Sequence, residues 1–226
     1  MHKVLVVEDD IEIAEGIGKI LTKEGWSYEL CHTGGDALQM LKLTQFDVVL
    51  LDWELPDYSG QEIIRRYRRD GGRATVIFVT GQNSMDYMEV GLNDGADDYI
   101  TKPFNPREII ARIKANKRRG RLLAEGLSVG ALNLDVKGLA LKTGDGTIVL
   151  TNTEAQILQV FFKHQSDVFS SSQLFNQVWS NDSEAQSDTV RVHMHILRRK
   201  LALKGLKELI LTVPNAGYRL NPEFIE

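Results

Sequence analysis

The chain has 226 residues and a formal net charge of −4, a length that accommodates two modest domains. Its composition, 42% hydrophobic and 26% charged, is typical of a globular protein. No apolar run approaches the ~20 residues of a membrane span, and the apolar segment at the N-terminus is too short for a secretory signal. The single cysteine, Cys31, excludes an internal disulfide framework. We therefore expect a cytoplasmic protein without a membrane partner.

Residues 1–120 alternate short apolar strands with amphipathic helices. Segments such as VVLL at 48–51 are apolar at every position, which is typical of parallel strands covered by helices on both faces. The alternation predicts a doubly wound α/β domain with a five-stranded parallel sheet. The expected strands are Lys3–Val7, Ser27–Cys31, Asp47–Leu51, Thr75–Thr80 and Asp97–Ile100.

Several of these strands end in polar residues. The first runs into the acids Glu8–Asp10, the third into Asp52 and the fourth ends at Thr80, while the fifth leads to Lys102. Because sites in such sheets form outside the carboxyl ends of the strands, these carboxylates should converge, and they would repel one another unless a cation lay among them. Oxygen ligands suit Mg²⁺. Lys102 and Thr80 would then bind phosphoryl oxygens, and Asp52 can act as a nucleophile.

The second part of the chain has a different pattern. Residues 121–127 are expected to form a linker and residues 128–226 a separate α+β domain. Alternating apolar positions from 132 to 150, with a turn at Gly144–Gly146, predict a small antiparallel sheet. Three helices (Thr153–His164, Ser171–Trp179 and Asp188–Leu203) and a hairpin (Leu209–Val213 and Gly217–Leu220) follow. This order is typical of a winged helix-turn-helix domain.

Several motifs, in order along nearly the whole chain, resemble one family. They are Glu8-Asp9, LLDWELP around Asp52, VTG at Thr80, GADDYITKPF at Gly95–Phe104, and the later LTNTEAQIL and TVPNAGYRL. Together they resemble a bacterial two-component response regulator of the OmpR/PhoB type. The resemblance implies a flavodoxin-like receiver domain followed by a DNA-binding winged helix domain that controls transcription.

The resemblance also implies roles for the residues of the pocket. Asp52 would accept a phosphoryl group from the phosphohistidine of a sensor histidine kinase. Glu8, Asp9, Asp52 and the backbone carbonyl of Glu54 would bind Mg²⁺, while Thr80 and Lys102 would bind the phosphoryl oxygens. The side chains of Glu54 and Gln82 would tune loss of the phosphoryl group.

Two further implied features concern signalling. Tyr99 would be the switch aromatic that moves inward together with Thr80, and Lys102–Pro103 would be a cis peptide, since proline lowers the cost of the cis form. In this family the face formed by the fourth helix, fifth strand and fifth helix dimerises through charged pairs. The matching positions here are Asp97, Asp98, Glu108 and Arg112, with Met88 and Val90 where relatives usually place basic residues. We therefore expect a homodimer on phosphorylation, with a hydrophobic contribution.

The last predicted helix would enter the DNA major groove. Its core-facing residues should be Val190, Met194, Leu197 and Leu201. The candidate DNA-binding residues are Thr189, Arg191, Val192, His195, Ile196, Arg198, Arg199 and, in the wing, Arg219. Arginines bind phosphates or guanine edges, and apolar side chains such as Val192 and Ile196 contact thymine methyl groups.

Three positions depart from the family pattern. Relatives often carry arginine where this chain has Asp188, Ile196 and Pro214, and each missing cation weakens phosphate attraction. Residues 127–226 also carry equal numbers of acidic and basic side chains. An alternative is therefore an effector domain that acts mainly by protein–protein contacts, with weak or no sequence-specific DNA binding. The acidic loop 180–187 is expected to contact RNA polymerase, again by resemblance.

An enzyme that uses an aspartyl phosphate is the least favoured interpretation. Such phosphatases usually have a second aspartate two residues after the nucleophile, where this chain has Glu54, and no substrate cap domain is visible. We expect no enzymatic activity apart from phosphoryl transfer to Asp52 and slow self-dephosphorylation.

Overall fold

The computed structural model describes residues 3–82, 84–118, 127–179 and 186–225. The chain divides into two compact units, residues 1–113 and residues 114–226, and each is described by itself. Within the described ranges, no helix has both the length and the apolar character needed to cross a membrane.

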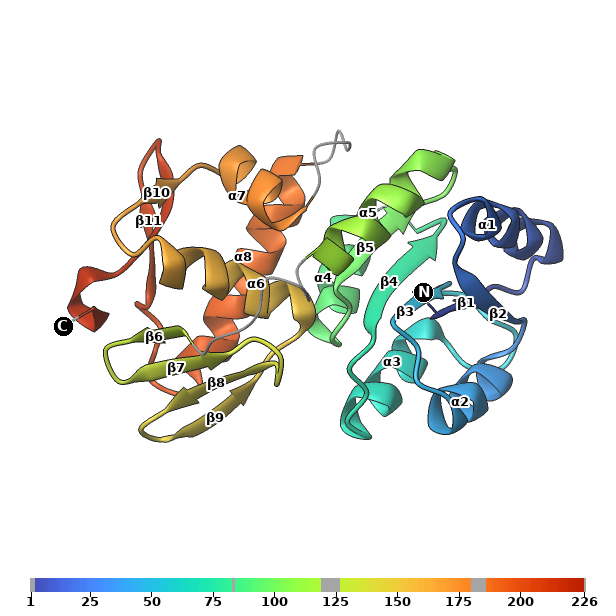
Figure 1. Cartoon of the computed structure of the whole chain (residues 1–226), viewed down its shortest axis with the longest axis horizontal. Coiled ribbons are helices and arrows are strands. Elements are labelled where there is room, and N and C mark those ends of the chain that lie inside the picture. The colour runs from blue at the N-terminus through green and yellow to red at the C-terminus, as the bar shows by residue number, and fades with distance from the viewer. Residues whose placement is uncertain (1–2, 83, 119–126, 180–185, 226) are drawn as a thin grey trace. The chain divides into compact units, whose positions relative to one another are not determined.

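The first unit is built on a five-stranded parallel sheet in the order β2-β1-β3-β4-β5 (Figure 1). The strands are β1 (Lys3–Val7), β2 (Ser27–Cys31), β3 (Val48–Leu51), β4 (Thr75–Thr80) and β5 (Asp98–Thr101). The predicted doubly wound fold is confirmed, and the predicted fifth strand shifts by one residue. Every residue of β3 and β4 is buried, as expected for parallel strands covered on both faces.

Helices cover both faces of this sheet. They are α1 (Ile11–Lys23), α2 (Gly34–Leu43), α3 (Gly60–Arg69), α4 (Met85–Asn93) and α5 (Pro106–Arg118). Ile17 of α1 and Ile109 of α5 share one core cluster with Val6 and Ile77 of the sheet. Figure 1 shows α1 and α5 on this face and α2 and α3 on the other. Side chains alternate along β4, so Phe78 faces the opposite side, where it lies close to Gly91 of α4.

The strand order brings the ends of β1 and β3 together. Val7 pairs with Leu51, and the Asp52 amide continues the ladder with a hydrogen bond to the Val7 carbonyl at 2.9 Å. The residues that follow, Glu8 and Asp52, are therefore neighbours at the carboxyl edge of the sheet. This register, set by the two buried strands, positions the acidic pocket.

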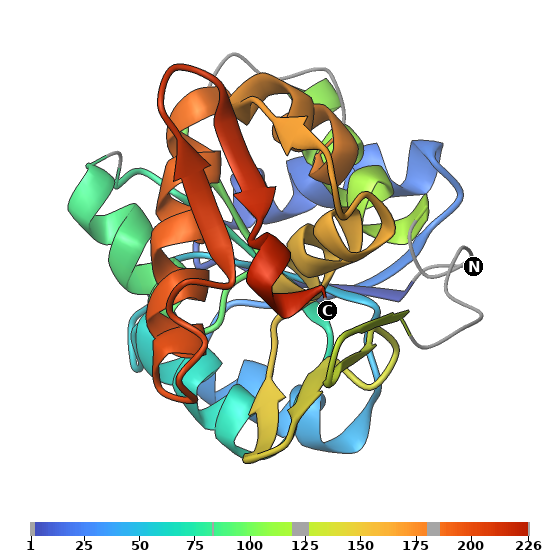
Figure 2. The same cartoon turned by 90° about the vertical axis from the view of Figure 1, so that its left-hand side faces the viewer.

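In the residues that the structure describes, the second unit contains two antiparallel sheets, three α-helices and a short 3₁₀ helix (Figure 2). A four-stranded sheet, β6-β7-β8-β9, precedes the helices, and a three-stranded sheet, β10-β12-β11, carries the C-terminal hairpin. The strands are β6 (Leu127–Val129), β7 (Leu132–Asp135), β8 (Ala140–Thr143), β9 (Gly146–Val149), β10 (Val168–Phe169), β11 (Ile210–Val213) and β12 (Gly217–Leu220). The helices are α6 (Asn152–Lys163), α7 (Ser171–Val178), α8 (Gln186–Ala202) and the short 3₁₀ helix η1 (Pro222–Phe224). The predicted winged helix architecture is confirmed.

Two strands of this unit, β6 and β10, were not predicted from the sequence. Leu127, predicted to end the linker, begins β6, because it pairs with Leu134 and packs against the core. The two-residue strand β10 pairs with β12 and is too short to give a pattern in the sequence. The rest of the predicted linker lies outside the described residues, so the domain boundaries at 120 and 128 stay predictions.

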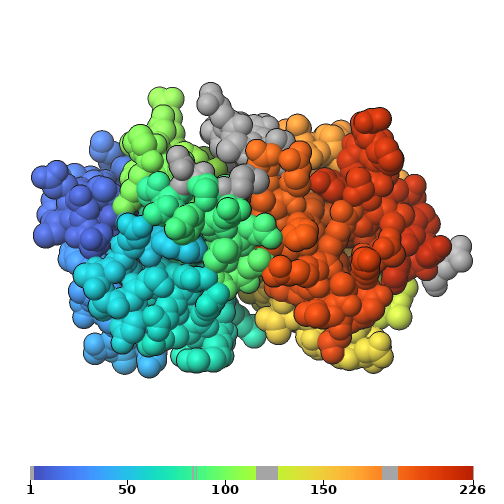
Figure 3. Space-filling view, turned by 180° about the vertical axis from the view of Figure 1, so that it is seen from behind, coloured from blue at the N-terminus to red at the C-terminus, as the bar shows by residue number. Residues whose placement is uncertain are grey.

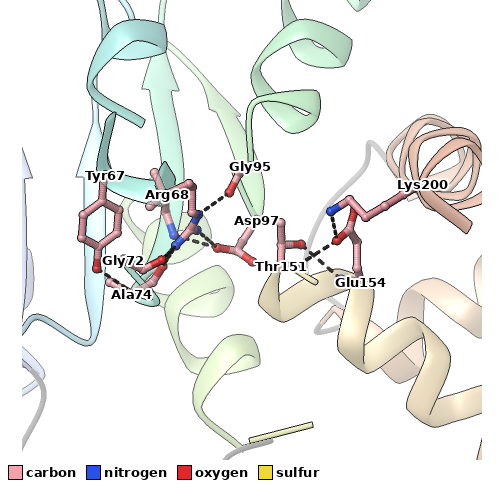
Figure 4. Close-up of polar contacts among 10 residues, drawn as sticks. Tyr67, Arg68, Gly72, Ala74, Gly95, Asp97, Thr151, Glu154 and Lys200 are labelled. Carbon is pink, nitrogen blue, oxygen red and sulfur yellow. Dashed lines mark hydrogen bonds and ion pairs between the residues drawn. The ribbon is translucent and has the colours of Figure 1, made fainter. Parts of the chain in front are cut away.

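The core of the second unit includes the predicted inner face of α8. Val190, Met194, Leu197 and Leu201 all belong to one buried cluster. A buried carboxylate fixes α6 against α8: Glu154 accepts hydrogen bonds from the Thr151 amide at 2.8 Å and from Lys200 Nζ at 2.5 Å (Figure 4). Thr151 and Glu154 also form a capping box at the start of α6, which satisfies two backbone donors that the helix leaves open.

Candidate functional site

An acidic pocket lies at the carboxyl edge of the parallel sheet. Lys102 Nζ is 2.7 Å from Glu8 Oε1 and 2.7 Å from Asp52 Oδ2, so one ammonium bridges two buried carboxylates. Asp9 is exposed beside them, and ligand atoms of Glu8, Asp9 and Asp52 lie within 4.8 Å of one another. This oxygen-only group fits a hard divalent cation.

The electrostatics of the pocket follow from burial and mutual proximity. Burial raises the pKa of Glu8 to about 7; the Lys102 hydrogen bond opposes this rise, and the Asp52 charge adds to it. Burial lowers the pKa of Lys102, but its bonds to Asp52 and Glu8 outweigh that effect, so the pKa lies above its ordinary value. Lys102 therefore stays charged and neutralises part of the acidic cluster.

The loop after Asp52 is tightly packed. The Trp53 amide donates to Asp52 Oδ1 at 2.6 Å, and the Gly60 amide donates to the Trp53 carbonyl at 2.8 Å. A Cβ atom at Gly60 would lie 2.2 Å from the Asp52 carbonyl oxygen, so only glycine fits at this position. The Trp53 ring packs against Phe78 and, edge-on, against Tyr87 of α4, with centroid separations of 4.9 and 5.4 Å. Trp53 was not among the predicted site residues, although it directly follows Asp52.

A second set of polar contacts links Glu54 to Tyr99. Gln82 Nε2 donates to Glu54 Oε1 at 2.7 Å, and the Gln82 amide lies 3.3 Å from Thr80 Oγ1. The Tyr99 hydroxyl donates to the Gln82 carbonyl. Burial raises the pKa of Tyr99 to about 12, and the charge of Asp52 adds to the rise. The structure therefore brings the predicted switch residues Thr80 and Tyr99 together through Gln82.

The predicted cis peptide between Lys102 and Pro103 is present. It directly follows β5 at the point where the chain leaves the pocket for α5.

The acidic residues predicted for a dimer face have partners within the chain. Asp97 is fully buried, and its Oδ2 accepts from Arg68 Nη2 at 2.8 Å and from the Val76 amide at 2.9 Å (Figure 4). Arg68 also donates to the carbonyls of Gly72, Ala74 and Gly95. The interpretation of Asp97 as a surface charge is thus wrong, because it completes a buried ion pair between α3 and the start of β5.

The other charged members of the predicted dimer face form a local network, in which Asp98 and Arg112 are buried like Asp97 and Glu108 is half-buried. Arg112 donates to Asp98 Oδ1 at 2.6 Å and to Glu108 Oε1 at 2.9 Å. On α4, Met88 is half-buried and Val90 is 39% exposed, beside the similarly exposed Tyr87. The apolar character expected of α4 is therefore present at the surface of the described residues.

The outer side of α8 lies beside the β11–β12 hairpin on the surface of the second unit (Figures 2 and 3). Arg191, His195 and Arg199 are exposed, and Nη1 of Arg191 lies 3.4 Å from Oδ1 of Asp188. Thr189 is buried, in contrast to the prediction, because it lies in the first turns of α8, next to the core residue Val190.

The two apolar candidates on α8 give a mixed result. Val192 and Ile196 are outside the core cluster, as predicted, but only 7% and 4% of their surfaces are exposed. The expectation that they offer an open apolar surface is therefore not met, since apolar side chains one helical turn apart are stabilised by being covered. Their contact with thymine methyl groups stays a prediction.

Arg198 has a different environment from the one predicted. It donates from Nε and Nη2 to the Ile210 carbonyl at 3.0 and 2.8 Å and from Nη2 to Thr212 Oγ1 at 2.9 Å. Its guanidinium also lies over the Tyr218 ring, 5.4 Å from the centroid. Arg198 thus connects α8 to the hairpin instead of projecting freely toward a ligand.

The tip of the hairpin is described, whereas the loop expected to contact RNA polymerase is not. Pro214–Ala216 are exposed, Asn215 has a positive φ of 59°, and Arg219 is half-buried on β12. Residues 180–185 of the loop 180–187 lie outside the described residues, so the polymerase contact stays a prediction.

Two protein families match the chain. The response regulator receiver domain matches residues 4–114, and the C-terminal domain of transcriptional regulatory proteins matches residues 145–220. The transcriptional regulatory protein DltR of Streptococcus agalactiae serotype III (strain NEM316) is 34% identical over 96% of this chain and 98% of its own length. The phosphate regulon transcriptional regulatory protein PhoB of Klebsiella pneumoniae is 35% identical over 99% of both chains.

A solved structure extends the likeness to the fold. The response regulator DrrB, a Thermotoga maritima OmpR/PhoB homolog, covers 98% of this chain and 99% of its own, with 28% identity and a TM-score of 0.53. The two matched families, the full-length relatives and the acidic pocket all indicate the same kind of protein. The chain belongs to the OmpR/PhoB-type two-component response regulators, in which a receiver domain is the target of a sensor kinase and a C-terminal domain binds DNA to regulate transcription.

Proposed function

We propose that Asp52 is the residue that accepts the phosphoryl group from the sensor histidine kinase. The observation that carries this proposal is the Lys102 ammonium, which contacts Asp52 and Glu8 beside Asp9 at the carboxyl edge of the sheet. An oxygen of Asp52 attacks phosphorus, and the P–N bond to the kinase histidine breaks. Its electron pair returns to the imidazole, which takes a proton from solvent.

The cation that fits the pocket best is Mg²⁺, held by Glu8, Asp9, Asp52 and the Glu54 backbone carbonyl. A divalent ion would offset the charge of the acids and of the incoming phosphoryl oxygens. Lys102 and the Thr80 hydroxyl bind the remaining phosphoryl oxygens. Since Lys102 already contacts Asp52, its ammonium needs little rearrangement at transfer.

Phosphorylation adds about −1.5 to −2 charge beside Lys102 and Thr80. We infer that Thr80 is drawn toward the new oxygens, and that the Gln82–Tyr99 contact transmits this change to α4 and β5. Asp98 and Arg112, which are buried in this structure, and the half-buried Glu108 then exchange their internal partners for those of a second copy. Val90 adds apolar area to this homodimer interface.

The Glu54–Gln82 hydrogen bond supports a role for both side chains in the lifetime of the phosphorylated state. We propose that they control the approach of water during slow self-dephosphorylation. The Glu54→Ala and Gln82→Ala variants should change the decay rate of the phosphoprotein, and unchanged lifetimes would contradict this role.

In the effector domain, we propose that Arg191, His195 and Arg199 make the contacts of α8 with DNA, while Arg219 and the hairpin approach the neighbouring backbone. Asp188 and Pro214 are exposed and neither carries a positive charge, which supports a smaller number of phosphate contacts than is usual for this kind of domain. Dimerisation then supplies much of the affinity for DNA.

We place the protein in the bacterial cytoplasm, where its phosphodonor and DNA are both present. We propose a receiver domain at residues 1–120 and an effector domain from about residue 128 to residue 226.

The test of the central proposal is to locate the modified residue. The full-length protein is incubated with acetyl phosphate and Mg²⁺, and the product is mapped by mass spectrometry after reduction of the acyl phosphate with borohydride. Label should appear on Asp52, disappear in Asp52→Asn or in the presence of EDTA, and persist in Asp70→Asn, which changes an exposed carboxylate at the far end of α3. Label on another residue would contradict the proposal.

A further inference from the structure

Asp57 lies five residues after Asp52, in the loop 53–59 between β3 and α3, and its carboxylate is bound by backbone amides. Oδ1 accepts from the amides of Gly34 at 2.7 Å and Tyr58 at 2.9 Å, and Oδ2 accepts from the amide of Gly35 at 2.8 Å. Gly34 and Gly35 form the first turn of α2, more than 20 residues earlier in the chain. The side chain therefore ties the loop to a different helix.

Helix α2 depends on this contact for two of its amides. Its own N-cap residue, Thr33, accepts from the Asp36 amide at 3.2 Å, which leaves the amides of Gly34 and Gly35 to be satisfied by other groups. Asp57 satisfies both, and its negative charge is favoured at the N-terminus of a helix. Loss of hydration raises the pKa of Asp57, but the amides of Gly34, Gly35 and Tyr58 outweigh it, so the pKa lies below its ordinary value.

The approach leaves little room for a side chain on the α2 side. A Cβ atom at Gly35 would lie 3.1 Å from Asp57 Oδ2, and one at Gly34 would lie 2.9 Å from side-chain atoms of Ile63 and Tyr58. The carboxylate and the two glycines therefore fit as a unit. Asp57 is exposed, but three backbone amides hold its carboxylate in this position.

The first residues of the loop, next to the pocket, are held by other contacts. Trp53 is held by Gly60 and by aromatic packing, and the side chain of Glu54 is bonded to Gln82. Asp57 is the connection from this loop to α2 among the described hydrogen bonds. The distal half of the loop is also held by Arg66, whose guanidinium lies 4.6 Å from the centroid of the Tyr58 ring, but that contact leads to α3 and not to α2.

We propose that Asp57 is a positioning residue that holds loop 53–59 against α2 and thereby orients the Glu54 backbone carbonyl for the divalent cation. The inference rests on the proposed metal site. It adds α2, which contributes no side chain to the pocket, to the elements that determine cation affinity.

Two variants test the contact from its two sides. Asp57→Asn removes the charge and turns an N–H group toward an amide donor. Gly35→Ala leaves Asp57 unchanged and favours helix formation in α2, but its methyl group displaces the carboxylate. The matched control is Gly16→Ala in α1, where a Cβ atom meets no other atom within 4 Å. The Mg²⁺ dissociation constant of the full-length protein is measured by isothermal titration calorimetry, and the melting temperature is measured alongside.

Loss of a group that hydrogen-bonds directly to a metal ligand weakens binding by roughly 10- to 100-fold. Asp57 acts on Glu54 through the loop, so we expect Asp57→Asn to raise the Mg²⁺ dissociation constant by less, up to about 10-fold. Gly35→Ala should shift it in the same direction without lowering the melting temperature, and Gly16→Ala should leave it unchanged. Wild-type affinity in Gly35→Ala and in folded Asp57→Asn would overturn the inference and leave the proposed metal site intact. If the wild-type protein bound no Mg²⁺, the proposed metal site would fail, and the inference with it.

Discussion

Asp52 and Lys102 show how a charged residue is accommodated at the end of a buried strand. Asp52 follows four buried residues of β3, and Lys102 approaches it from the loop after β5. A carboxylate in this position is stabilised only if a cation compensates for lost hydration. The structure provides one cation from the chain itself, and the adjacent carboxylates of Glu8 and Asp9 provide ligands for a second.

The first prediction concerns Lys102→Met. The variant should retain Mg²⁺ binding but accept phosphate from acetyl phosphate roughly 100-fold more slowly, because a donor aimed at developing charge is lost. The rate of phosphorylation at saturating Mg²⁺ is the measurement. Lys19→Met, which alters an exposed side chain of α1, serves as the control. An unchanged rate in Lys102→Met would show that Lys102 does not contact the phosphoryl group.

The second prediction concerns the pH dependence that Asp57 gives to stability. Its pKa is lowered in the folded state, so the ionised carboxylate stabilises the fold above the pKa of the unfolded chain. This contribution disappears as the pH falls through the lowered pKa of the folded state. Urea titrations should show Asp57→Asn less stable than the wild type at pH 7, with the difference shrinking on acidification below the ordinary aspartate pKa of about 3.9. A difference that is constant with pH would contradict this assignment.

Among the structural elements, helix α3 determines how the start of β5 is held. Gln61 Nε2 and Arg65 Nε each donate to a carboxylate oxygen of Asp94 at 2.7 Å. Arg68 donates to Asp97 and to the Gly95 carbonyl. The C-terminal end of α4 and the loop to β5 are therefore fixed to α3. The N-terminal end of α4 lies near Gln82 and the pocket, so a response to phosphorylation should be largest there.

The third prediction tests this attachment with Arg68→Ala. Removing the guanidinium takes the Arg68 ion pair away from the buried Asp97 carboxylate, which costs about 3–5 kcal/mol in free energy of unfolding. The adjacent Arg69→Ala removes an exposed side chain and should change stability by less than about 0.5 kcal/mol. Chemical denaturation of both variants checks the difference. Equal stabilities would mean that Asp97 is not held by Arg68.

The fourth prediction separates two neighbouring arginines of α8. Arg199→Ala should weaken binding to DNA and reduce the slope of log affinity against log salt by about one, as expected for a lost phosphate contact. Arg198→Ala should instead loosen the hairpin, because three hydrogen bonds to β11 are lost. Fluorescence anisotropy over a range of salt concentrations, together with the thermal stability of each variant, distinguishes them. The assignment is wrong if Arg198→Ala changes only the salt slope.

For the whole molecule, the two units have separate hydrophobic cores and separate tasks. The receiver domain carries the acidic pocket, and the effector domain carries the exposed cations of α8. A signal from one to the other therefore requires a change in a surface. The face formed by α4, β5 and α5, on which Val90 is exposed, includes the strand that carries Tyr99, the proposed switch residue.

The fifth prediction is that phosphorylation favours a dimer through this face. Sedimentation velocity with Mg²⁺ and beryllofluoride, a phosphoryl mimic, should shift the wild-type protein from monomer to dimer. Val90→Glu places a charge in the apolar part of the interface and should prevent this shift without preventing phosphorylation. Val149→Glu, at an exposed position of β9, should not. A wild-type protein that remains monomeric with the mimic would contradict the prediction.

Much of the architecture could be predicted because it depends on local patterns. Strands that are apolar at every position indicate a parallel sheet, and the acids that follow β1 and β3 must meet when those strands are neighbours. The inner face of α8 could likewise be predicted from helical spacing. These features need only the period of a strand or helix and the rule that sites form at the carboxyl edge of the sheet.

The sequence by itself therefore determined the two domains, the acidic pocket and the candidate phosphoryl acceptor. Only the tertiary structure decided which charged side chains are available. Asp97 and Arg198 are bound within the chain, and Asp57 reaches amides more than 20 residues away. Long polar side chains bind whatever donors and acceptors the fold places beside them, and that proximity depends on packing between elements. The periodicity of apolar residues along the chain does not reveal which side chains of different elements lie close together.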